Sequence, residues 1–206
     1  MVFVGNSRIL SVGTYRPKRV VPNSEIVDRI DSTDEWIVQR TGIESRRFAG
    51  DDETVISMAK AACEIALKRA KLSIEDIDTV ILSTISYPFQ APSAATELIN
   101  ELGNPKAAAF DISAACAGFC YGVAMASDLV RSGTSRNVLV IGVEKLSDYT
   151  DPDDRATAFI FADGAGAVII GQSDQPRIGQ TIWGSDADSR DAITLTPSFL
   201  DYKKNP

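Results

Sequence analysis

The stretch Ala107-Ala-Ala-Phe-Asp-Ile-Ser-Ala-Ala-Cys-Ala-Gly118 decides the fold, because it joins an apolar strand to a helix through a turn of small residues. Residues 107–111 are predicted to form a buried strand, and the turn 113–118 leads into a helix that ends at Gly133. Cys116 lies at this junction. A buried strand that passes into a helix is typical of proteins in which helices cover a sheet.

The same alternation of strands and helices continues on both sides of the junction. Strands are predicted at 7–13, 79–85, 138–143 and 165–171, and helices at 23–30, 32–42, 53–71 and 93–103. Strands that are apolar on both faces require helices on both sides of the sheet. The sequence therefore predicts an α/β fold, layered α-β-α, with a mixed and mostly parallel sheet.

Polar residues are predicted to mark where several helices begin. Asn23 and Ser93 are each expected to cap the helix that follows them. Ser32 and Glu35 stand at the spacing of a capping box, in which each side chain binds the other residue's backbone N–H. The segment Ser73–Asp76 repeats that spacing.

The composition excludes several classes of protein. Of the 206 residues, 44% are hydrophobic and 24% are charged, so a core can form without a metal or a disulfide. The net charge of −7, from 21 basic and 28 acidic residues, is opposite to the basic surface that nucleic acid binding needs. The longest apolar run, 138–143, is far shorter than the ~20 residues that cross a membrane. We therefore expect neither nucleic acid nor a membrane as a partner.

Cysteine and histidine usage bear on the compartment and on the chemistry. Three cysteines are an odd number, and the first residues lack the basic and apolar pattern of a signal peptide, so a reducing, cytoplasmic location is expected. Histidine is absent. Any mechanism has to work without the commonest general base, and no metal site is expected.

Cys116 is the first candidate for a catalytic residue. A thiol at a helix N-terminus meets the positive end of the helix dipole, which favours the nucleophilic thiolate. The small residues around it leave room for a bulky acyl group. The alternative is that Cys116 is a small buried hydrophobic residue, as free cysteines often are. Cys120 faces the same side of the helix, and Cys63 is expected in the core.

Two further patterns are ambiguous on their own. Trp36 and Arg40 share a helix face, where they could stack a nucleotide base and bind a phosphate. A half-buried tryptophan beside a solvated arginine fits the same spacing. The segment Phe161-Ala-Asp-Gly-Ala-Gly-Ala167 precedes a β-rich run and not a helix, so it is predicted to be a tight turn into a core strand and not a dinucleotide-binding loop.

Five segments of the chain match one family together. They are 32–43 (Ser-Thr-Asp-Glu-Trp-Ile-Val-Gln-Arg-Thr-Gly-Ile), Arg46-Arg47, 110–119 (Phe-Asp-Ile-Ser-Ala-Ala-Cys-Ala-Gly-Phe), Asp154-Arg155 and 161–166 (Phe-Ala-Asp-Gly-Ala-Gly). In order and approximate spacing, residues 8–172 resemble beta-ketoacyl-[acyl carrier protein] synthase III, a family of thiolase-fold condensing enzymes. The resemblance implies that residues 1–172 form the N-terminal half of the family fold, and that 173–206 begin the connection to a second half.

The resemblance also implies an activity. Enzymes of the family transfer an acyl group from acyl-CoA to a cysteine, here Cys116. They then condense it with malonyl-[acyl carrier protein], with loss of CO₂, to start fatty-acid synthesis. The CoA thioester is a substrate, no cofactor is implied, and the enzyme is expected to be a homodimer.

Roles for single residues follow from the same resemblance. Trp36 and Arg155 match the pair that holds the CoA adenine, and Arg40 matches a contact to a CoA phosphate. Ser32 and Thr41 match positions in the same wall.

Three other positions match the part of the family site that receives the acyl chain. Leu146 and Phe161 match residues that line its end. Ala91 matches a bulky aromatic residue that, in members using short primers, reaches over the acyl pocket from the dimer partner. A small residue there implies a roomier channel.

The family's catalytic His and Asn belong to the second half of its fold, and this chain contains no histidine. We therefore expect the 206-residue chain alone to be inactive in condensation. Two other functions fit the sequence: a CoA-dependent acyltransferase on the same fold, and a non-catalytic scaffold subunit. A cysteine at a helix start argues against the scaffold, which has no need of it.

Overall fold

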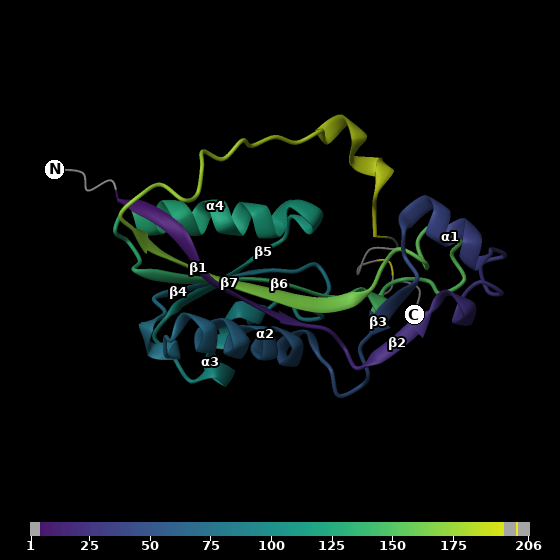
Figure 1. Ribbon diagram of the computed structural model, residues 1–206, viewed down its shortest axis with the longest axis horizontal. Helices are drawn as coiled ribbons and strands as arrows, with labels where there is room; N and C mark the ends of the chain where they lie inside the picture. The colour runs from purple at the N-terminus through teal and green to yellow at the C-terminus, as the bar shows by residue number, and fades with distance from the viewer. Residues whose placement is uncertain (1–4, 196–200, 202–206) are drawn as a thin grey trace.

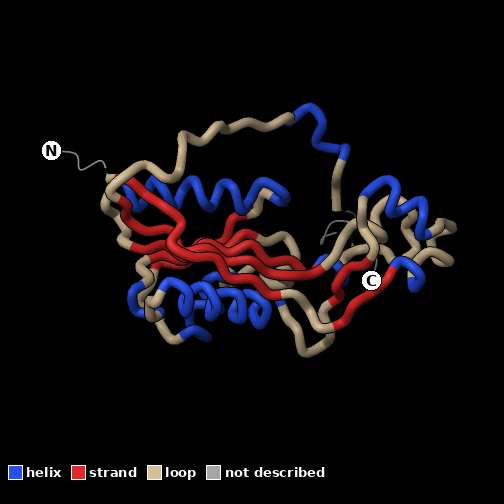
Figure 2. Tube along the Cα trace, viewed as in Figure 1, coloured by secondary structure: helices blue, strands red, loops and turns tan. Residues whose placement is uncertain are grey.

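A five-stranded sheet forms the centre of the computed structural model, which describes residues 5–195 and 201. Its strands lie in the order β1-β7-β6-β4-β5, and helices cover both faces (Figures 1 and 2). The strands are β1 (Asn6–Tyr15), β4 (Thr79–Ser83), β5 (Ala108–Ile112), β6 (Asn137–Lys145) and β7 (Asp163–Ser173). The helices are α1 (Asp34–Thr41), α2 (Val55–Ala70), α3 (Ala94–Leu102) and α4 (Gly118–Arg131). The predicted α-β-α layering is confirmed.

The sheet is mixed, as expected, but it is not mostly parallel. β4 pairs in parallel with β5 and with β6, whereas β7 is antiparallel to both β6 and β1. The chain between β6 and β7 contains only the short 3₁₀ helix η4 (Leu146–Asp148) and turns. Parallel neighbours need a crossover connection, usually a helix, so β7 returns antiparallel beside β6.

Apolar side chains fill the space on each face of the sheet. On one face α2 and α3 pack against the strands around Met58, Leu82 and Leu98, and on the other α4 packs around Ile81 and Ile170 (Figure 2). All five side chains are fully buried. Each large apolar side chain buried in this way stabilises the fold by about 1.5–3 kcal/mol.

A smaller lobe lies at one end of the sheet and consists of β2 (Arg19–Pro22), β3 (Ser45–Phe48) and α1 (Figure 1). β2 and β3 pair antiparallel. The lobe is joined to the chain before β7 by Arg46, whose buried guanidinium donates to Val21 O at 3.2 Å, Asn23 Oδ1 at 2.6 Å and Phe159 O at 3.2 Å. Burial lowers the pKa of Arg46. We refer to this part of the molecule as the β2–β3 lobe.

The predicted start of α1 is wrong by one residue. Thr33 is the cap, since its hydroxyl accepts a hydrogen bond from Trp36 N at 3.2 Å, and Ser32 precedes it. The helix ends at Gly42, as predicted, with the left-handed φ of 73° that glycine adopts without strain. The helix therefore has the predicted extent, but its N-cap is Thr33 and not Ser32.

Asn23 does not cap a helix. Only a 3₁₀ turn, η1 (Asn23–Glu25), forms there, and the Asn23 amide is buried, where it donates to Asp34 Oδ1 at 2.6 Å and Ile43 O at 2.8 Å. A tertiary contact has replaced the local cap. The two other predictions hold: Ser93 caps α3, and the box at Ser73–Asp76 forms around the 3₁₀ helix η2 (Ile74–Asp76).

Two strand predictions need correction. β5 is an edge strand and is only half-buried, although its residues are apolar. Gly164 and Gly166 lie inside β7, which begins at Asp163, so they do not form the predicted turn. Gly164 allows Tyr15 of the neighbouring strand to approach, because an added Cβ would stand 3.3 Å from its carbonyl oxygen.

Beyond β7 the chain runs in an extended path over α4, and η5 (Ala187–Ala192) is a 3₁₀ helix within it (Figure 1). Tyr121 of α4 holds this path, since its hydroxyl donates to Gly184 O at 3.0 Å and its ring lies 4.8 Å from that of Trp183. Residues 196–200 and 202–206, part of the expected connection 173–206, lie outside the described residues. No helix among those described is long and apolar enough to cross a membrane.

Candidate active site

Cys116 lies just after the carboxyl end of β5, in the 3₁₀ helix η3 (Ala115–Ala117) that leads into α4. Its side chain is exposed, so it is not a buried hydrophobic residue. Ala115 has a φ of 42°, a left-handed conformation that costs a non-glycine residue about 1–2 kcal/mol. The strand–turn–helix junction is as predicted, and the thiol stands next to the N-terminal end of α4.

The start of α4 packs directly on the end of β4. A Cβ added to Gly118 would lie 2.0 Å from Ser83 Oγ, so only glycine allows this approach. The chain that follows β4 also joins β5, since Thr84 N donates to Ile112 O at 3.3 Å. The turn that carries Cys116 therefore lies at the carboxyl ends of two neighbouring parallel strands, where binding sites of such sheets commonly form.

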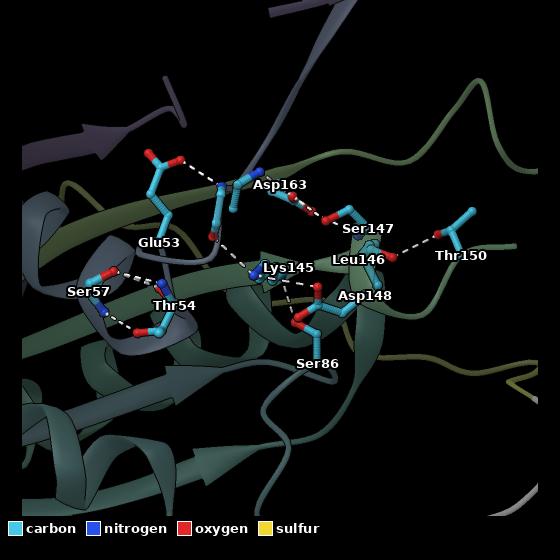
Figure 3. Close-up of polar contacts among 12 residues, drawn as sticks. Glu53, Thr54, Ser57, Ser86, Lys145, Leu146, Ser147, Asp148, Thr150 and Asp163 are labelled. Atoms are coloured by element: carbon cyan, nitrogen blue, oxygen red, sulfur yellow. Dashed lines mark hydrogen bonds and ion pairs between the residues drawn. The ribbon is translucent and has the colours of Figure 1, made fainter. Parts of the chain in front are cut away.

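Asp163 holds two loops at this end of the sheet, and the sequence analysis gave it no role. Its buried carboxylate accepts hydrogen bonds from Ala49 N at 2.7 Å, Ser147 N at 2.9 Å and Ser147 Oγ at 2.6 Å (Figure 3). It thus joins the loop after β3 to the turn after β6. The available signal was an acid followed by glycines at the start of an apolar strand.

Glu144 is the second carboxylate that was missed. It stands at the end of β6, where it accepts hydrogen bonds from Ile85 N and the hydroxyls of Thr84 and Ser86. Burial is the main cause that raises its pKa, and these hydrogen bonds oppose the shift. Its signal in the sequence is an acid that directly follows the apolar run 138–143.

Trp36 in the β2–β3 lobe lies beside both arginines that the resemblance assigns to CoA. The guanidinium carbon of Arg40 is 4.9 Å from the centroid of the indole ring, and that of Arg155 is 5.8 Å away. The ring of Phe159 meets the indole edge-on at 5.4 Å. A base stacked between Trp36 and Arg155 needs about 7–8 Å, two contacts of optimal length. The gap between Trp36 and Arg155 is therefore too narrow for a base to stack there, and we call this arrangement the closed position.

Arg155 is held in this closed position by the chain before α1. It donates to the backbone oxygen of Asp31 and lies 3.3 Å from the Asp31 carboxylate. Both side chains are exposed, and exposed ion pairs contribute only about 0–1 kcal/mol. Moving Arg155 aside therefore costs little.

Ser32 and Thr41 lie at the two ends of α1, with different hydroxyl environments. Thr41 Oγ1 donates to Ile37 O at 2.7 Å and accepts from Ile43 N at 3.0 Å, so the helix end itself uses this group. Ser32 Oγ is buried and has no hydrogen-bond partner among the described residues. Of the two, only Ser32 has an unused donor for a ligand.

The three residues assigned to the acyl end are not all brought together. Phe161 lines a cavity of about 320 Å³, and Ser147 lines it too, but its neighbour Leu146 does not. Ala91 is exposed in the loop before α3 and is not part of that lining. Cys116 does not line this cavity either.

The other cysteines differ from Cys116 in their surroundings. Cys63 is buried in α2, as expected, and burial raises the pKa of its thiol far above the usual value. Cys120 is exposed on α4, one turn after Cys116. Within residues 5–195 and 201, no group of three or more Cys, Asp or Glu side chains is arranged to hold a metal ion.

The amino-acid sequence is similar to known synthases. The family model described as 3-Oxoacyl-[acyl-carrier-protein (ACP)] synthase III matches residues 110–187. The Beta-ketoacyl-[acyl-carrier-protein] synthase III of Streptomyces glaucescens is 52% identical over 198 residues, which cover 96% of this chain and 60% of that protein. The Mycobacterial beta-ketoacyl-[acyl-carrier-protein] synthase III of Mycobacterium tuberculosis (strain ATCC 25177 / H37Ra) is 49% identical and covers 96% and 59%.

Solved structures agree with the sequence comparisons. The priming beta-ketosynthase from the R1128 polyketide biosynthetic pathway superposes with a TM-score of 0.97 at 43% identity, covering 100% of this chain and 62% of that chain. The 3-oxoacyl-[acyl-carrier-protein] synthase III of Aquifex aeolicus VF5 gives 0.80 at 44% identity, covering 82% and 55%. The chain thus spans about 60% of the length of the curated relatives that it matches.

Proposed function

Because the chain belongs to the beta-ketoacyl-[acyl-carrier-protein] synthase III family, we propose that it accepts an acyl group from acyl-CoA on Cys116. We propose further that the whole enzyme condenses this group with malonyl-[acyl carrier protein] to start fatty-acid or polyketide synthesis. The observation that carries the proposal is the exposed thiol at the start of α4, beside the ends of β4 and β5. The named relatives are all synthases, which does not favour a simple acyltransferase or a scaffold.

Acylation needs little beyond the thiol and its position. The Cys116 thiolate attacks the carbonyl carbon of the acyl-CoA thioester, the C–S bond to CoA breaks, and CoA leaves as a thiolate that takes up a proton. One thioester replaces another. The helix dipole of α4 supports this step, because it stabilises negative charge on the attacking sulfur.

Condensation needs groups that the chain lacks. Malonyl thioester loses CO₂, its carbanion attacks the carbonyl of acyl-Cys116, and the 3-oxoacyl product leaves as the Cys116 thiolate is restored. The family resemblance assigns the polarisation of the malonyl thioester to a His and an Asn. The chain contains no histidine, so we propose that these groups belong to the part of the relatives that it does not span.

CoA is proposed to bind at the β2–β3 lobe. Trp36 and Arg155 offer the two planar groups between which the adenine stacks, and Arg40 offers positive charge for a phosphate. The adenine enters when Arg155 leaves its weak contacts with Asp31. The unpartnered hydroxyl of Ser32 is a further donor in this wall.

Leu146 and Phe161 are proposed to line the acyl end. Ala91, in an exposed loop, is proposed to face that end from the other subunit of a cytoplasmic homodimer.

Release of CoA provides the test. Mixing the protein with acetyl-CoA should release up to one equivalent of CoA per chain, which a thiol-specific dye measures after removal of the protein. Cys116→Ala should abolish the release, whereas the matched variant Cys120→Ala should retain it. Release that survives Cys116→Ala and disappears in Cys120→Ala would overturn the assignment.

A further inference from the structure

The carboxylate of Glu144 binds three consecutive residues of the loop after β4. Its Oε1 accepts from Ile85 N at 3.0 Å, and its Oε2 accepts from Thr84 Oγ1 at 3.3 Å and from the Ser86 hydroxyl. Ser86 Oγ in turn accepts from Lys145 N at 2.8 Å. One side chain of β6 thus holds the whole segment 84–86.

This carboxylate has no counter-ion within the described part of the chain: none of the ion pairs there includes Glu144. The neighbouring Lys145 directs its ammonium group to Gly50 O at 3.3 Å and to the Asp148 carboxylate at 3.5 Å (Figure 3). A half-buried charge without a cation depends on its hydrogen-bond donors. The carboxylate and the loop therefore hold each other in place.

The segment 84–86 adjoins the turn that carries the nucleophile. It follows Ser83, whose hydroxyl lies against Gly118, and Thr84 N donates to Ile112 O at 3.3 Å. Ile112 is the last residue of β5, four residues before Cys116. A shift of the loop would therefore move the surface against which the Cys116 turn packs.

We propose that Glu144 is a positioning residue for Cys116: by fixing 84–86 between β6 and β5, it keeps the nucleophile turn in the geometry that accepts an acyl group. The inference rests on the proposed acyl transfer, but it concerns a residue that touches neither the substrate nor the thiol. It acts through the loop. A misplacement of the reacting sulfur by about 1 Å can lower a rate about 100-fold.

The test compares Glu144→Gln with Asp78→Asn in the full chain. Asp78 directly precedes the same strand β4, at the opposite end from the loop 84–86, and its carboxylate accepts from Arg136 N at 2.7 Å and Asn137 N at 3.2 Å. Both changes replace a loop-binding carboxylate by an amide, but only Glu144 is next to the nucleophile turn. Ser86→Ala, which removes the bridge to Lys145, serves as a second variant if Glu144→Gln does not fold.

The rate of CoA release is measured over a range of acetyl-CoA concentrations. We expect Glu144→Gln to lower the maximal rate about 10- to 100-fold with little change in the half-saturating concentration. Asp78→Asn should retain the rate of the original protein. An unchanged maximal rate in both Glu144→Gln and Ser86→Ala, or an equal loss in Asp78→Asn, would overturn the inference.

A second readout separates this inference from the proposed function. In a Cys120→Ala background, Cys116 is alkylated with iodoacetamide, a reaction that needs no CoA site. If the original protein releases no CoA, the proposed function fails, and the alkylation rates alone decide the role of Glu144. A rate that Glu144→Gln changes and Asp78→Asn does not supports positioning, and equal rates in all three proteins contradict it.

Discussion

Cys116 is distinguished from the other two cysteines by its surroundings. Cys63 is buried on α2, where burial raises the pKa of its thiol and keeps the thiol protonated. Cys120 is exposed but lies one turn into α4. Cys116 alone combines exposure with the helix start and with small neighbours, and this combination was visible in the sequence as a run of alanines and glycine after an apolar strand.

Removal of the Trp36 ring should weaken CoA binding. Stacking of a base on an aromatic ring contributes about 1–3 kcal/mol, so Trp36→Ala should raise the dissociation constant about 5- to 150-fold. Isothermal titration calorimetry with CoA measures this dissociation constant. Trp183→Ala, which removes the other tryptophan from the path over α4, should leave the constant as it is. An unchanged constant in Trp36→Ala would refute the assignment.

Glu53 should stabilise the fold in a way that depends on pH. Hydrogen bonds from Gly50 N and the Tyr15 hydroxyl lower the pKa of its carboxyl below the usual value. A lowered pKa contributes stability that is present above the unfolded value of about 4.3 and is lost as pH falls through the folded value.

Glu53→Gln should therefore lower the free energy of unfolding by about 1–3 kcal/mol at pH 7, because one of the two oxygens that accept hydrogen bonds from Tyr15 and Gly50 becomes an NH₂ group that cannot accept. Urea unfolding at a series of pH values measures the difference. This difference should shrink as pH falls below about 4.3 and through the lower pKa of the folded state, because the original carboxyl becomes protonated over that range. A difference that stays constant down to pH 2 would contradict the account.

At the scale of elements, α4 depends on a glycine at its first residue. Gly118→Ala would place a Cβ 2.0 Å from Ser83 Oγ, and such overpacking costs about 1–3 kcal/mol. Gly166→Ala in β7 meets nothing within 4 Å and should stabilise the strand by about 0.5–1 kcal/mol. Thermal unfolding of the two variants should shift in opposite directions. A Gly118→Ala protein as stable as the original would show that α4 does not pack as described.

Long elements with one strong pattern could be predicted from the sequence, and contacts between distant residues could not. The helix 53–71 appears as α2 because its apolar residues repeat at helical spacing over four turns. Asn23 was misassigned because its amide binds Asp34 and Ile43, which no local pattern reveals. The carboxylates of Glu144 and Asp163 were missed for the same reason, since their partners are loops far away in the chain.

The candidate site was predictable in part. The strand–turn–helix junction at Cys116 and the helix face shared by Trp36 and Arg40 could be predicted from sequence spacing alone. Arg155 is distant from Trp36 in the sequence and lies beside it only because of the tertiary fold. The sequence also could not predict that β7 runs antiparallel to β6, because the alternation of residues along a strand is the same in parallel and antiparallel pairs.

At the scale of the whole molecule, the 206-residue chain should accept an acyl group but should not condense it. It contains no histidine, and the proposed decarboxylation of the malonyl thioester needs one. With malonyl-[acyl carrier protein] present, the acylated chain should release no CO₂ above background, as measured with malonyl labelled at the free carboxyl carbon. CO₂ release at the rate of a complete synthase would show that decarboxylation proceeds without the His.

The position of the acyl group tests the central claim most directly. After incubation with acetyl-CoA, cleavage at Lys106 and Arg131 yields one peptide that contains both Cys116 and Cys120. Fragment ions formed by cleavage between the two residues in tandem mass spectrometry show which thiol carries the added acetyl mass. The account predicts that the mass lies on Cys116, and acetyl found on Cys120, or on neither thiol, would contradict it.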